Sequence, residues 1–225
     1  VEGSRRDLTS VVTNEPSNAL FNAYYGDFLG SRHEYALALN YLNNANTLDP
    51  DLGMSYVQTA KILLTLGLEE LAKEALNQSS GLDLPTVPDM IDRGQIYAFF
   101  RQYDLALSDL DEAIRINPNR AESYNARAKT YASTGAFEPA LTDFNMAIQI
   151  DTTNVDYYLN QGALYTILGE YDLAISDLDQ AILMDSSNAK SFNVRAAAYL
   201  GIGNLESALE DITRAVGIQQ GLGSG

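Results

Sequence analysis

The sequence predicts an all-α protein, a solenoid of six helix pairs, and three observations indicate this fold class. A shift of 34 residues aligns the chain with itself without a gap from residue 19 to residue 222. Within each 34-residue repeat, apolar positions lie three or four apart in two stretches, which is the spacing of two amphipathic helices. Small and large residues also recur at fixed positions, as expected where helices pack closely.

The six repeats span residues 19–52, 53–86, 87–120, 121–154, 155–188 and 189–222. Each is expected to contain a first helix around positions 4, 8 and 11 and a second helix around positions 20, 24, 27 and 28. Position 20 is small in every repeat: Ala38, Ala72, Ala106, Ala140, Ala174 and Ala208. Position 24 is large in every repeat: Leu42, Leu76, Leu110, Phe144, Leu178 and Ile212.

Glycines indicate where helices approach each other and where they end. In repeat five, Gly162 and Ala174 are expected at a close contact between the two helices, and Gly169 is expected to turn the chain between them. Prolines and a glycine interrupt the helical pattern between Asn77 and Asp89, so the helix limits there are undefined and we expect a looser joint.

The two ends of the chain lie outside the repeats. Residues 1–18 are expected to form an N-terminal capping arm, because Leu8, Val11 and Val12 continue the register backward as a second helix over residues 5–15. Residues 223–225 are expected to be a short tail. The chain begins with Val1 rather than Met, which predicts a start that has been processed or trimmed.

Composition excludes several classes of function. The chain of 225 residues has 14 basic and 30 acidic side chains and a formal net charge of −16, which argues against binding of nucleic acid or of anionic membranes. It has no cysteine, so disulfides and thiolate sites are excluded. No apolar run reaches the roughly 20 residues of a spanning helix. We expect a soluble chain that is either cytoplasmic or exported after removal of an upstream signal.

The pattern resembles the tetratricopeptide repeat family over residues 19–222. That family has a large residue at position 4, Gly or Ala at 8, Tyr at 11 and Ala at 20 and 27. Repeats three to five fit best, with Ala113, Ala147 and Ala181 at position 27, whereas Asn22 at position 4 and Ser79 at position 27 depart from it. The resemblance implies a right-handed α-α superhelix, and a non-enzymatic scaffold that binds a protein or peptide in a concave groove.

We expect no catalytic, cofactor-binding or metal site. His33 is the only histidine, so no two-histidine metal site exists, and it is expected to be a solvated residue of the loop between two helices. Gly201 and Gly203 do not follow a strand and are interpreted as a turn rather than as a phosphate loop.

Arginine and aspartate recur together at positions 7 and 23. Repeats three, four and six have both residues: Arg93 with Asp109, Arg127 with Asp143 and Arg195 with Asp211. Repeat five has Gln161 with Asp177. We interpret the pairs as half-buried ion pairs between the two helices of a repeat, structural rather than ligand-binding.

In the family that this chain resembles, positions 2, 5, 6, 9, 12 and 13 line the groove. We expect the partner to contact Asn125, Lys129, Asn160, Lys190 and Asn193, because amides can bind a peptide backbone and lysine can pair with carboxylates. One branch of the family holds a terminal carboxylate with Lys and Asn; Asn160 and Lys190 fit that pattern, but Val194 replaces a basic residue. Simple solvation of the asparagines is the alternative.

Repeats one to three present a mixed set at the same positions, without a recognisable pattern: Tyr24, Asp27, Lys61, Asp92, Gln95 and Phe99.

The last helix presents an apolar surface that no later helix of the sequence covers. Leu209, Val216 and Ile218 cannot all pack on the first helix of repeat six, because a helix face is about 100° wide. We expect this end to meet a second copy, a partner or a further native segment, with self-association preferred. A structural subunit that assembles through its ends, or the interaction domain of a longer regulatory protein, are therefore alternative functions.

Overall fold

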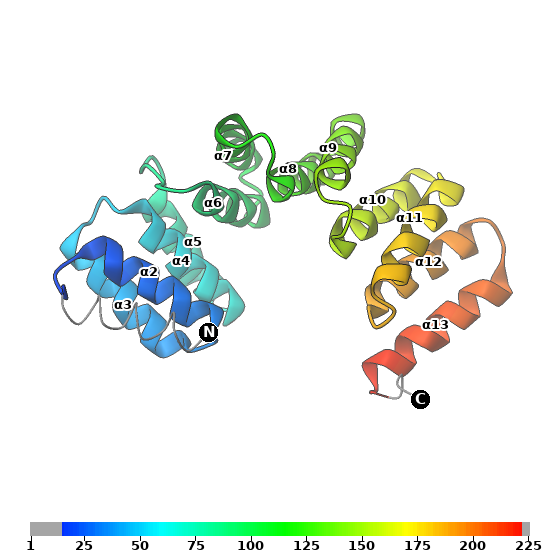
Figure 1. The fold of residues 1–225 in the computed structure, drawn as a ribbon, viewed down its shortest axis with the longest axis horizontal. Coiled ribbons are helices and arrows are strands. Elements are labelled where there is room, and N and C mark those ends of the chain that lie inside the picture. The colour runs from blue at the N-terminus through cyan, green and yellow to red at the C-terminus, as the bar shows by residue number, and fades with distance from the viewer. Residues whose placement is uncertain (1–14, 222–225) are drawn as a thin grey trace. The chain divides into compact units, whose positions relative to one another are not determined.

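The computed structural model describes residues 15–221, which form twelve α-helices and no β-strand (Figure 1). The predicted all-α fold class is confirmed. The helices are α2 (Ala19–Ser31), α3 (Tyr35–Leu48), α4 (Gly53–Thr65), α5 (Glu69–Ser79), α6 (Val87–Phe99), α7 (Tyr103–Ile116), α8 (Ala121–Thr134), α9 (Phe137–Ile150), α10 (Val155–Leu168), α11 (Tyr171–Met184), α12 (Ala189–Gly201) and α13 (Leu205–Gln219). The helix expected over residues 5–15 and the tail expected at 223–225 lie almost wholly outside the described residues.

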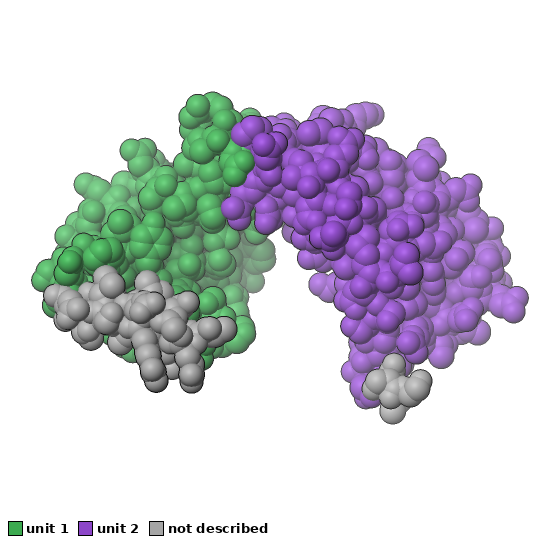
Figure 2. All heavy atoms as spheres, in the orientation of Figure 1, with its two compact units in different colours: residues 1–117 green, residues 118–225 purple. Residues whose placement is uncertain are grey.

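The chain divides into two compact units (Figure 2). Unit 1 runs from Val1 to Asn117 and holds α2 to α7, and unit 2 runs from Pro118 to Gly225 and holds α8 to α13. Within each unit the two helices of a repeat pack against each other, and each second helix contacts the first helix of the next repeat. The first helices also contact one another, in the order α2, α4, α6 in unit 1 and α8, α10, α12 in unit 2.

A small residue at position 8, glycine in repeats one, three and five, allows the close approach of the two helices of a repeat. A Cβ atom at Gly162 would lie 2.8 Å from Cγ of Leu178 and 3.2 Å from the carbonyl oxygen of Ala174, closer than ordinary packing permits. Gly169 ends α10 with φ +80°, a left-handed conformation that glycine adopts without steric cost. The expected close contact and the expected turn in repeat five are both present.

The segment between α5 and α6 is held by specific contacts. Helix α5 ends at Ser79 and α6 begins at Val87, capped by the side chain of Thr86. Nη1 of Arg93 donates hydrogen bonds to the carbonyl oxygens of Ser79, at 2.7 Å, and Leu82, at 2.8 Å. Leu84 is buried in the core of unit 1. The joint is looser in helix packing, as expected, because α5 contacts α6 less than the other second helices contact the next first helix within a unit, but an arginine and a buried leucine hold the linker itself.

Candidate functional site

Buried ion pairs join the two helices of repeats three, four and six, as expected. Nε of Arg93 lies 2.7 Å from Oδ2 of Asp109, and its Nη2 lies 2.8 Å from Oδ1. The same two-pronged geometry joins Arg127 to Asp143 at 2.7 and 2.8 Å. Since both partners of each pair are largely buried and saturate each other, these charges stabilise the helix pair and are not exposed to a ligand.

The third pair also links neighbouring repeats. Nε and Nη2 of Arg195 donate to Asp211 at 2.9 and 2.7 Å, while Nη1 reaches back to Oδ1 of Asp179 on α11 at 2.5 Å. These hydrogen bonds, that to Asp211 foremost, raise the pKa of Arg195 despite its burial, so the guanidinium stays charged. Position 7 of one repeat thus contacts position 25 of the repeat before it.

Repeat five has the aspartate without the arginine. Nε2 of Gln161 donates to Oδ1 of Asn145 at 3.0 Å, which repeats the contact between positions 7 and 25 but leaves Asp177 alone. Oδ2 of Asp177 is buried and has no hydrogen-bond partner among residues 15–221. Burial raises the pKa of Asp177 to about 6.

The structure brings together two of the five residues predicted to bind a partner. Nδ2 of Asn160 on α10 donates a hydrogen bond to Oδ1 of Asn125 on α8 at 3.0 Å, and both side chains are half-buried. The amide pair is not repeated between α10 and α12, because Leu159 and Val194 pack there in an apolar cluster.

The other three predicted residues are exposed: Lys129 on α8 and Lys190 and Asn193 on α12. Within the described part of the chain, their side chains form no hydrogen bond or ion pair with one another or with the amide pair. Their charges and amide are therefore open to solvent.

The equivalent face of unit 1 holds a polar cluster that the sequence analysis did not identify. Nζ of Lys61 lies 2.6 Å from Oδ2 of Asp92, and Nε2 of Gln58 donates to Asp89 at 3.2 Å and to Asp92 at 3.3 Å. A hollow of about 230 Å³ beside it is lined in part by Asp27. Burial raises the pKa of Asp27, and Lys61 partly opposes that rise.

The signal for this cluster was present in the sequence. Gln58 and Asp92 both occupy position 6, in successive repeats, and Lys61 lies at position 9. Two first helices in contact place such positions side by side, so comparison of position 6 between neighbouring repeats would have found the pair.

His33 is an exposed residue of the loop between α2 and α3, as expected. Its φ of 62° places it in the left-handed region, and its Nδ1 lies 2.5 Å from the hydroxyl of Tyr35. Across residues 15–221 there is no group of three or more His, Cys, Asp or Glu side chains that could hold a metal ion. The helices of that region are all too short or too polar to cross a membrane.

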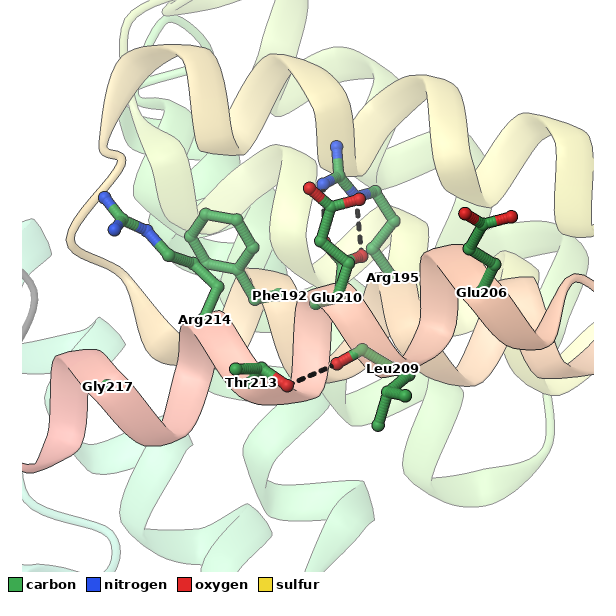
Figure 3. Close-up of a pocket in the computed structure, with 9 residues that line it drawn as sticks. Phe192, Arg195, Glu206, Leu209, Glu210, Thr213, Arg214 and Gly217 are labelled. Carbon is green, nitrogen blue, oxygen red and sulfur yellow. Dashed lines mark hydrogen bonds and ion pairs between the residues drawn. The ribbon is translucent and has the colours of Figure 1, made fainter.

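The last helix carries the residues predicted for self-association. Leu209 is 66% exposed and Val216 is 44% exposed, whereas Ile218 is half-buried. A hollow of about 890 Å³ lies along α12 and α13, lined among others by Phe192, Arg195 and Glu210 (Figure 3). In this view Leu209 and Thr213 point to the side of α13 opposite Glu210.

Comparison with known proteins identifies the repeat. Models of the tetratricopeptide repeat match residues 91–155 and residues 155–188. No curated protein sequence matches the chain.

Solved structures share the fold at low sequence identity. A chain of the APC/C hetero-tetramer Cut9–Hcn1 matches with a TM-score of 0.75 and 19% identity, over 97% of this chain and 44% of that one. PilF of Pseudomonas aeruginosa matches with a TM-score of 0.68 and 16% identity, over 92% of this chain and 90% of PilF. YrrB, described as a tetratricopeptide repeat protein with an unusual peptide-binding site, has a TM-score of 0.59 and 21% identity, over 82% and 95%.

This chain spans less than half the length of the first of these structures. The family is generally non-enzymatic. The matched repeats and the shared fold show that the chain is a tetratricopeptide repeat protein, of the kind that forms scaffolds for protein–protein interaction.

Proposed function

We propose that this scaffold binds an extended peptide segment of a partner protein across α8, α10 and α12 of unit 2, without catalysis. The observation that carries the proposal is the hydrogen bond of Asn160 to Asn125, which joins two first helices and fixes both amide groups. An amide that is already oriented loses little conformational entropy when a ligand binds, so it is a better contact than a freely rotating one.

The amide pair keeps unused hydrogen-bonding groups. Each asparagine has two N–H donors and one carbonyl acceptor, and the pair uses one donor of Asn160 and part of the acceptor capacity of Asn125. The second N–H and the carbonyl of Asn160 and both N–H groups of Asn125 stay available. A peptide backbone presents alternating C=O and N–H groups, which is the complementary pattern.

The lysines of this face indicate the charge of the ligand. Lys129 follows Asn125 by four residues on α8 and therefore lies on the same side of the helix, and Lys190 lies on the neighbouring α12. Both are exposed, as are Glu122 and Asp156 at position 2 of α8 and α10, so the lysines are two separate positive groups on a face of mixed charge. The ligand segment is therefore expected to carry acidic side chains, and its binding to weaken as salt is raised.

The peptide-binding site described for YrrB belongs to that protein. It supports the proposal only in that a chain with this fold can bind a peptide. The residues proposed here rest on the amide pair and the exposed lysines of this chain.

The test begins with affinity capture of partners from the source cells, followed by overlapping peptides of each recovered protein to locate the bound segment. The double variant Lys129→Ala/Asn160→Ala should lower the affinity for that peptide by about 1–3 kcal/mol, because both residues are central contacts. Lys73→Ala, which removes an exposed lysine of α5 in unit 1, is the matched control. Unchanged affinity of the double variant would reject the site.

A further inference from the structure

An exposed apolar stripe runs along α13. It consists of Leu205, Leu209, Ile212 and Val216, which are 69%, 66%, 41% and 44% exposed. Their spacing of four, three and four residues is that of the a and d positions of a coiled coil, so the four side chains form one narrow line along the helix. Ile218 lies two residues beyond Val216, on a different side of the helix, and does not belong to this stripe.

The same stripe on α11 is covered. Its residues are Tyr171, Ile175, Leu178 and Ile182, and α12 packs on it. Leu178 is fully buried there, whereas its counterpart Ile212 is 41% exposed on α13. Unit 2 therefore contains this helix face twice. On α11 the following first helix covers it, and on α13 none of the described residues covers it.

In unit 2, the second helices that are followed by another repeat carry side chains at two positions that contact the next first helix. On α13 both positions hold a different kind of residue. Internal repeats of unit 2 carry an aromatic ring at position 17, Phe137 or Tyr171, and the ring of Tyr171 lies where a Cβ of Gly201 would be. On α13 this position is Leu205.

Internal repeats also carry a hydrogen-bonding side chain at position 25 that contacts position 7 of the next repeat, as Asn145 contacts Gln161 and Asp179 contacts Arg195. On α13 position 25 is Thr213, whose hydroxyl donates to the carbonyl oxygen of Leu209 in its own helix at 2.7 Å (Figure 3). The stripe on α13 thus lacks two features that hold the next first helix on α9 and α11.

We propose that α13 pairs with α13 of a second copy of this chain, antiparallel across a two-fold axis. A two-fold axis perpendicular to a helix makes that helix antiparallel to its mate. With the axis between Leu209 and Ile212, Leu209 lies opposite Ile212 of the second copy, and Leu205 lies opposite Val216 of the second copy.

The charges around the stripe favour this occupant. All four residues of the stripe are uncharged. In the antiparallel register Glu206 lies near Thr213 of the second copy rather than near an acidic residue. Glu210 and Arg214 point to the other side of α13, so two chains of net charge −16 meet without a charged contact along the axis (Figure 3). Since only four side chains of each copy take part, the dimer is weak and depends on concentration.

The test is sedimentation equilibrium of the full chain over a wide concentration range, with three variants. Leu209→Glu and Ile212→Lys each place charges against an apolar side chain of the second copy, and each should raise the dimer dissociation constant at least about tenfold. The double variant Leu209→Glu/Ile212→Lys places glutamate opposite lysine twice and should recover most of the dimer. Leu183→Glu, at a residue of α11 that is 79% exposed, is the control and should leave dimerisation unchanged.

Recovery in the double variant also excludes misfolding as the cause of the single losses, and circular dichroism of each variant checks its helix content. A chain that is monomeric at every concentration overturns the proposal. So does a double variant as monomeric as the two single variants, because in a parallel or unrelated contact the introduced charges do not meet.

Discussion

The first helices of units 1 and 2 carry polar groups on equivalent faces. In unit 1 these groups bind one another, whereas in unit 2 most of them are open to solvent. In unit 1, Gln58 and Lys61 are bound to Asp89 and Asp92 of the next repeat, so the polar groups of this cluster have hydrogen-bond and ion-pair partners within the protein. In unit 2 only one hydrogen bond joins the amides, and the exposed lysines stay open to solvent. A polar groove is available to a ligand only where its groups have not already been paired within the protein.

The framework beneath these faces is common to the two units. Arg93 and Asp109 in unit 1 and Arg127 and Asp143 in unit 2 form the same bidentate pair with nearly the same distances. The interior is therefore repeated while the surface varies, which is the arrangement expected of a scaffold whose partner is selected by surface residues.

The largest effect is expected from breaking this common framework. Asp109→Ala leaves the guanidinium of Arg93 buried without its carboxylate, which should lower the free energy of unfolding by about 3–5 kcal/mol. Asp211→Ala should cost less, because Arg195 keeps its contact with Asp179. Urea unfolding followed by circular dichroism measures both, with Glu74→Ala, at an exposed residue of α5, as the control. A loss no greater than that of the control would show that the pair is not structural.

A smaller effect is expected in repeat five, where the framework is incomplete. The pKa of Asp177 is raised by burial to about 6, so the folded state binds its proton more tightly than the unfolded state does. Between about pH 4 and pH 6, ionisation therefore costs stability as pH rises, and above that range the cost is constant. Asp177→Asn removes this ionisation.

Relative to the unmodified chain, Asp177→Asn should gain about 1 kcal/mol between pH 4 and pH 8, a value that allows for solvent screening of a partly exposed carboxylate. Thermal unfolding at a series of pH values measures the difference. A difference that stays constant across the series would contradict the burial of an unpaired carboxylate.

The smallest effect is expected at the turns within repeats. Position 15 is glycine throughout unit 2, at Gly135, Gly169 and Gly203. In unit 1 only Gly67 is a glycine, and the other two residues are His33 with φ 62° and Arg101 with φ 59°. Because the left-handed region is costly for a residue with a Cβ, His33→Gly and Arg101→Gly should each stabilise the protein by about 0.5–1 kcal/mol. Calorimetry would show a higher melting temperature for each variant; a lower one would mean that side-chain contacts such as that of His33 with Tyr35 dominate.

The sequence predicted the parts of the structure that depend on the repeat alone. The pairing of helices was predicted from the 34-residue repeat. The Arg–Asp pairs were predicted because the same repeats carry arginine at position 7 and aspartate at position 23. The cluster around Lys61 was missed, because its contacts join different repeats and an aspartate at a surface position has many solvated alternatives. The anchor of the linker after Ser79 was not predicted, since it is the side chain of Arg93 bound to backbone carbonyl groups, which no residue pattern displays.

The most direct measurement is nuclear magnetic resonance of the side-chain amide groups during titration with the recovered partner peptide. If the open face of unit 2 is the binding site, the signals of Asn125 and Asn160 shift and saturate together, while that of Gln58 in unit 1 stays in place. Saturating shifts at Gln58 without any at Asn125 and Asn160 would contradict the site, and would place the ligand on the face whose polar groups are paired within the protein.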